Sequence, residues 1–160
     1  MVRAIHAVDD RVALRISLAE RPGLGGLDGG WWPQSRDLEV ELRDLIDHFP
    51  GAAGRIVGVI CSQPDWEDSD DPASHIATRD RRVEVSRFPG GADTHLLIIR
   101  TAGHGRLHML VVPPTATLTL GKRALRLAAH SSSRLSPALV MRTLGPAALR
   151  PVAVAAALTS

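Results

Sequence analysis

The stretch from Gly23 to Ile46 constrains this chain more than any other, because it sets five glycines, two adjacent tryptophans and a proline directly before a helical pattern. Glycine permits positive φ and close approach of neighbouring backbone. Each indole brings a large apolar surface and one N–H donor. Trp31 and Trp32 are two of only five aromatic residues of the Phe, Trp and Tyr types. Such a loop either fixes a helix on a sheet or holds a ligand.

The pattern that follows the loop predicts one long amphipathic helix. Ser35 is the expected N-cap, and the acidic residues Asp37 and Glu39 favour the positive end of the helix. Apolar residues then recur at helical spacing; they are Leu38, Leu42, Leu45, Ile46 and Phe49. Pro50 and Gly51 end the helix.

Five segments show the alternation or the short apolar run that is typical of strands. They are residues 11–18, 56–61, 82–88, 95–101 and 106–112. The last two are joined by Ala102-Gly103-His104-Gly105, which predicts a hairpin. Because successive strands are closely connected, we expect a mostly antiparallel sheet of about five strands. Residues 64–80 are expected to form a polar surface loop that carries Trp66.

Two further segments return to helical spacing. Residues 118–129 predict a helix, and Ser136 and Pro137 predict the N-cap and first turn of a short helix that ends near Leu144. The expected fold is therefore α+β, with a single globular domain over residues 11–130. Residues 131–160 are expected to add the short helix and a loosely held tail.

The composition of the chain indicates in which cellular compartment the protein is expected. The single cysteine excludes an internal disulfide and suits a reducing cytoplasm. Two aspartates stand where a signal peptide needs its apolar core, and no apolar run reaches the 18 or so residues of a membrane span. We expect a cytoplasmic protein with no membrane partner.

The charges are divided unevenly along the chain. Residues 1–80 carry 8 Lys/Arg and 15 Asp/Glu, whereas residues 81–160 carry 11 and 2. The preferred interpretation is that the halves neutralise each other across the fold or between subunits. The alternative is weak nucleic-acid binding by the basic half, through Lys122, Arg123, Arg126, Arg134 and Arg142.

The sequence LDGGWWPQSRDL at residues 27–38 resembles the signature of a family of small actinobacterial domains of unknown function. The likeness covers about residues 11 to 128. The chain departs from the family habit at Cys61-Ser62, where a Tyr-Asn pair is common, and at Gln34, where Arg is common. The resemblance supports the domain boundaries, and it identifies no catalytic residue.

The candidate binding site lies in this signature and comprises Asp28, Gly29, Gly30, Trp31, Trp32 and Arg36. Adjacent residues of an extended backbone point to opposite sides. At least one indole is therefore expected to point inward, while the other covers the loop or lines a groove. In the ligand-binding interpretation the outer indole stacks on a ligand and Asp28 and Arg36 make polar contacts. In the structural interpretation the indoles anchor the helix to the sheet.

Histidines and the cysteine are the other candidates for chemistry. His95 and His108 are candidate polar lining residues and a candidate cross-strand pair. No third ligand accompanies them in sequence, so we expect no metal and no other cofactor. Cys61 is either a nucleophile or, by its apolar surroundings, a small buried hydrophobe.

These observations favour a non-enzymatic module that binds a small ligand or a partner at the Gly/Trp loop. The recognised catalytic and nucleotide-binding motifs are absent from the sequence. The alternative is an enzyme in which Asp28, Arg36 and a histidine converge on the same cleft.

Overall fold

The computed structural model describes residues 12–20, 26–68, 74–78, 80–89, 94–103, 105–130 and 136–145. The tail expected after Gly145, the hairpin residue His104, Arg134 and the first two glycines of the loop, Gly23 and Gly25, lie outside these ranges. Within them, no helix is long and apolar enough to cross a membrane.

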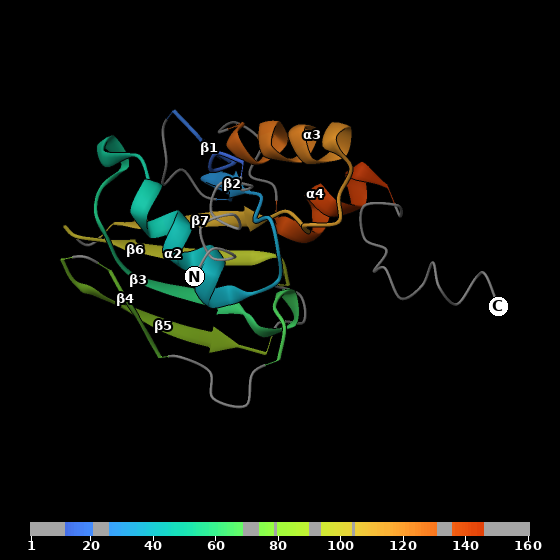
Figure 1. Cartoon of the computed structure of the whole chain (residues 1–160). Helices are drawn as coiled ribbons and strands as arrows, with labels where there is room; N and C mark the ends of the chain where they lie inside the picture. Colours follow the sequence, from blue (N-terminus) through green and yellow to red (C-terminus); the bar gives the residue numbers. More distant parts are fainter. Residues whose placement is uncertain are drawn as a thin grey trace.

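A mixed sheet of seven strands forms the centre of the described part of the chain (Figure 1). The strands are β1 (Ile16–Leu18), β2 (Gly29–Trp31), β3 (Ile56–Ser62), β4 (His75–Ala77), β5 (Arg82–Phe88), β6 (Leu96–Thr101) and β7 (Arg106–Val111), in the order β1-β2-β7-β6-β3-β5-β4. The pairs β2–β7 and β3–β5 are parallel, and the other four are antiparallel. The predicted antiparallel character is confirmed, but the predicted number of five strands is wrong.

The sequence analysis missed β2 and β4 because each has only three residues and little apolar pattern. Two of the three residues of β2 are glycines, and β4 lies in the segment expected to be a surface loop. Their backbone groups form hydrogen bonds with neighbouring strands. Their own side chains show no pattern that indicates a strand. The first strand is also shorter than predicted, since β1 does not include residues 12–15. All three residues of β1 are only partly buried.

The helix after the Gly/Trp loop is α2 (Leu38–His48), which has 11 residues and is no longer than α3. Its N-cap is Asp37, whose Oδ1 accepts a hydrogen bond from the Val40 backbone N–H at 3.3 Å. The predicted cap Ser35 instead donates to Glu41 Oε2 at 2.7 Å, and Glu41 Oε1 accepts from the Gln34 N–H at 2.9 Å. The buried Glu41 carboxylate therefore fixes the loop to the helix, a role that its place among charged residues concealed.

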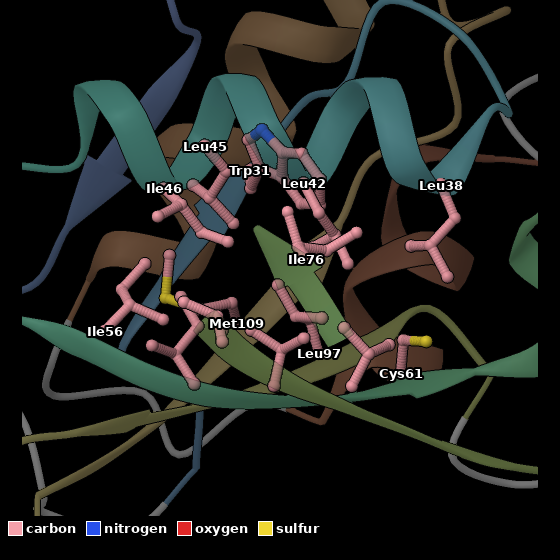
Figure 2. Close-up of a cluster of buried hydrophobic side chains, with 14 of the residues drawn as sticks. Trp31, Leu38, Leu42, Leu45, Ile46, Ile56, Cys61, Ile76, Leu97 and Met109 are labelled. Carbon is pink, nitrogen blue, oxygen red and sulfur yellow. The ribbon is translucent and has the colours of Figure 1, made fainter. Parts of the chain in front are cut away.

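The helices α3 (Leu118–Ala129) and α4 (Pro137–Leu144) have the predicted bounds. Their N-caps are Thr117 and Ser136, whose side chains accept from the Leu120 and Leu139 N–H groups. Both helices pack on the face of the sheet opposite to α2, so the sheet has two apolar cores. Figure 2 shows part of the core beneath α2, where Leu42, Leu45 and Ile46 point toward the sheet.

Candidate functional site

The two adjacent tryptophans enter different cores. Trp31 is 1% exposed and lies between α2 and the sheet (Figure 2), where its ring centroid is 5.6 Å from that of Trp66. Trp32 is 3% exposed and packs in the core of α3 and α4. The expectation that at least one indole points inward is confirmed, but the expectation that the other covers the loop or lines a groove is wrong, because both rings are buried. The surface position expected for Trp66 is wrong as well, since it packs against Trp31.

Polar contacts fix the second indole. Trp32 Nε1 donates to the Pro113 carbonyl at 3.1 Å, and the guanidinium carbon of Arg15 lies 3.8 Å from the centroid of the Trp32 ring. Arg15 also donates to the carbonyls of Trp32 and Pro33. A buried N–H is thereby satisfied, and the cation stacks on the ring face. The ring is thus held between Arg15, which precedes β1, the Pro113 carbonyl, which follows β7, and the residues of α3.

Glycines provide the space for this arrangement. A Cβ at Gly30 would lie 3.1 Å from both Leu125 and Ala128 of α3, and a Cβ at Gly29 would overlap the Ser17 carbonyl of β1. These two candidate site residues therefore serve close packing of β2. Gly121 of α3, which the sequence analysis did not select, lies directly against the Trp32 ring, and a Cβ there would overlap the ring.

Gly121→Ala is therefore expected to lower the free energy of unfolding by about 1–2 kcal/mol. Overpacking typically costs about 1–3 kcal/mol, and the better helix propensity of alanine returns up to about 1 kcal/mol. Chemical denaturation checks this value. Combining Gly121→Ala with Trp32→Leu should relieve the overlap, so additive losses in the double variant would count against the packing explanation.

Asp28 is buried, at 3% exposure, and joins β7 to the end of β1. Its Oδ2 accepts from the His108 backbone N–H at 2.8 Å and lies 3.6 Å from His108 Nδ1. Its own N–H donates to the His108 carbonyl at 2.7 Å, and its carbonyl accepts from the Ala19 N–H at 2.8 Å. The structure thus brings together two of the predicted residues, Asp28 and His108.

A hollow of about 340 Å³ adjoins Asp28. Its walls come from the end of β1, the residue before β2, the turn after α2 and the start of β7; the lining residues are Leu18, Ala19, Glu20, Asp28, Pro50, Ala52, Ala53 and Leu107. Six of these eight residues are apolar, and the remaining two carry carboxylates. Of the six predicted binding residues, Asp28 alone lines this hollow.

Arg36 and His95 lie at a second place, around Asp65 of the turn Gln63–Asp65. Arg36 donates to the carbonyls of Pro64 and Trp66 at 3.1 and 3.2 Å, and its own carbonyl accepts from the Glu67 N–H. Asp65 Oδ2 accepts from the His95 N–H at 2.9 Å. His95 has a φ of 71°, which is strained for a residue other than glycine. This backbone bond to Asp65 helps to hold that conformation.

Burial shifts both titrating groups of this second cluster. It raises the pKa of Asp65 to about 6, although the His95 N–H, the nearby Ser62 hydroxyl and Arg36 lower it. Burial also lowers the pKa of His95. Asp65 Oδ1 lies 3.2 Å from His95 Nδ1 but has no hydrogen-bond partner of good geometry among the described residues, and the same holds for Ser62 Oγ and Trp66 Nε1. The sequence analysis missed Asp65 because it assigned the residue to a surface loop.

The predicted cross-strand pair of His95 and His108 is wrong. In the β6–β7 register the residue opposite His108 is Ile98, and the His95 carbonyl accepts from the Val111 N–H. The structure therefore separates Asp28 and His108 from Arg36 and His95. Among the described residues, no group of three His, Cys, Asp or Glu side chains is placed to hold a metal ion.

Cys61 lies within β3, fully buried on the α2 side of the sheet (Figure 2). Burial raises the pKa of its thiol to about 11. Because the thiolate is the nucleophilic form, this environment favours the interpretation of Cys61 as a small buried hydrophobe over that of a nucleophile.

The fold and the hollow define an α+β domain with a mixed sheet covered by helices on both faces and a small apolar pocket beside a buried Asp. The chain belongs to a family of unknown function, DUF5994, whose model matches residues 14–128. No curated protein and no solved structure matches the chain.

Proposed function

We propose that the chain is a non-enzymatic module that binds a small ligand in the hollow beside Asp28. The observation that carries this proposal is a largely apolar hollow of about 340 Å³ built from four separate parts of the fold. Its volume lies at the lower end of the range typical of ligand pockets, which combine apolar walls with a few polar groups.

The charges around the hollow indicate which class of ligand it would bind. Glu20 and Asp28 are acidic, and Pro50 follows the C-terminal end of α2, where the helix dipole is negative. An apolar molecule that carries an ammonium or another N–H donor group matches this lining. The groups with the clearly raised or lowered pKa values discussed above, Cys61, Asp65 and His95, are not among the lining residues, which supports binding over catalysis.

We also propose that the module acts in the cytoplasm. Cys61 is the only cysteine, and it is buried as a free thiol. A protein without disulfides suits a reducing compartment. Fractionation of the native cell, with detection of the endogenous chain, tests the location.

Benzylamine and benzoate are suitable probes because they share a ring and differ in charge. In an NMR titration of the ¹⁵N-labelled protein, benzylamine is expected to shift the amide signals of Leu18, Ala53 and Leu107, and benzoate is expected to shift them far less. Ala52→Phe, at an exposed lining residue, should fill the hollow and weaken benzylamine binding about tenfold, which corresponds to about 1.4 kcal/mol.

Ala138→Phe is the matched control, because Ala138 is an exposed residue of α4 that does not line the hollow. It should leave benzylamine binding unchanged. Equal effects of the two substitutions, or shifts confined to residues outside the hollow, would refute the proposed site.

A further inference from the structure

The outer face of α3 is a second surface that the proposed ligand site does not use. Lys122, Arg123 and Arg126 are all exposed and lie opposite the buried residues Gly121, Ala124, Leu125 and Ala128 of the same helix. The last cation lies four positions after the first, a rise of about 6 Å along the helix. Three positive charges are therefore gathered on one solvent-facing side.

These cations are not neutralised within the described part of the chain. Arg55 and Arg100 pair with Asp80 and Glu84, each at 3.0 Å. In contrast, Lys122, Arg123 and Arg126 make no ion pair or side-chain hydrogen bond with a described residue. No carboxylate side chain occurs in the sequence from Thr94 onward. Within the described part of the chain, no acidic residue of the first half therefore pairs with the α3 cations, and neutralisation between subunits stays a prediction.

The fold also separates the opposite charges. The exposed acidic residues Glu39 and Asp47 belong to α2, which covers the other face of the sheet. Figure 1 shows α3 along the outer side of the molecule, away from the edge formed by β4 and β5. A positive face on the opposite side of the sheet from these two acids attracts anionic partners, and the attraction is strongest at low salt.

We propose that this face of α3 binds the phosphate backbone of duplex nucleic acid. Arginine matches the geometry of phosphate oxygens through paired N–H groups, and backbone contacts need no reading of bases. A membrane surface fits less well, because an interfacial helix must insert its apolar face, and that face of α3 is buried against the sheet. With no exposed aromatic side chain on α3, stacking on single-stranded bases is not favoured either.

Fluorescence anisotropy of a labelled 20-base-pair duplex tests the proposal with the full chain. For three phosphate contacts, a plot of log K against log salt concentration has a slope of about −3. Arg123→Gln with Arg126→Gln should reduce the slope to about −1 and weaken binding at least about fivefold at 50 mM salt. The control, Arg55→Gln with Arg100→Gln, removes the same net charge from paired residues and should change binding less than about twofold.

Three results would overturn the proposal. The first is equal weakening in both double variants, which indicates a response to net charge alone. The second is binding of poly-glutamate as tightly as the duplex, which indicates an acidic protein partner. The third is binding of phosphatidylserine vesicles without binding of the duplex, which indicates a membrane surface. Circular dichroism of each variant verifies that the fold is retained.

Discussion

Trp31→Ala and Trp32→Ala are each expected to lower the free energy of unfolding by about 3–5 kcal/mol, the range for removal of a buried aromatic side chain. Trp31 fills the core between α2 and the sheet, and Trp32 fills the core beneath α3 and α4. Each substitution leaves a cavity that the packed helices close only in part. The loss at Trp32 also removes the hydrogen bond to Pro113 and the contact with Arg15.

Urea denaturation of the single variants measures these losses. Val57→Ala is the control, because Val57 is 38% exposed on the sheet and its truncation should cost within about 0.5 kcal/mol. Trp→Phe at either position should recover more than half of the loss, since most of the ring remains. A loss below about 1 kcal/mol for either alanine variant would show that the indole does not anchor its helix.

The second large effect concerns pH. Asp65 is expected to make the protein less stable as pH rises from about 4 to about 6. Burial raises the pKa of its carboxyl to about 6 in the folded protein, whereas an Asp in an unfolded chain titrates near about 3.9. Between these values the folded chain keeps a proton that the unfolded chain has released, so rising pH favours unfolding. The difference corresponds to about 2–3 kcal/mol.

Asp65→Asn isolates this contribution, because the amide oxygen still accepts the His95 N–H but carries no charge. Relative to the native protein, the variant should gain about 2–3 kcal/mol of stability between pH 4 and pH 7, with the gain complete above the folded pKa. His95, whose lowered pKa acts in the opposite direction, should cancel in the comparison, because the burial that lowers its pKa and the backbone hydrogen bond with Val111 that raises it are both retained in the variant. Urea denaturation at a series of pH values measures the difference.

Asp80→Asn provides a control of opposite sign. The Thr78 hydroxyl first, and then Arg81 and Arg55, lower the pKa of the exposed Asp80 carboxyl. The native protein therefore gains stability at Asp80 as pH rises through the acidic range, and the Asn variant should lose stability relative to it. If the Asp65→Asn difference were independent of pH, the carboxyl would titrate as in the unfolded chain and the assignment would fail.

Much of the fold follows from patterns that are local in sequence. Helical spacing was enough to place α3, the Ser136 cap and Pro137 placed α4, and short apolar runs placed β3, β6 and β7. The predicted β6–β7 hairpin is confirmed. These predictions succeeded because periodicity and caps act within a few turns of the chain.

The candidate site was less accessible to sequence reasoning, because its contacts join distant residues. Asp28 meets His108 across 80 positions, and Asp65 meets His95 across 30. No local pattern encodes such meetings. A sequence motif of glycines and tryptophans also looks the same whether it packs helices on a sheet or lines a pocket. Of the predicted binding residues in that motif, only Asp28 adjoins the hollow.

The sequence by itself determined the α+β class, the C-terminal helices and the central strands, since each needs only the spacing of its own apolar residues. The tertiary structure alone decided that β2 enters the sheet, that Trp31 and Trp32 fill opposite cores, and that the α3 cations face away from the acidic helix. Strand pairing, side-chain burial and the separation of charges depend on which distant segments lie next to each other in the fold. The order of the strands in the sheet determines which segments are neighbours.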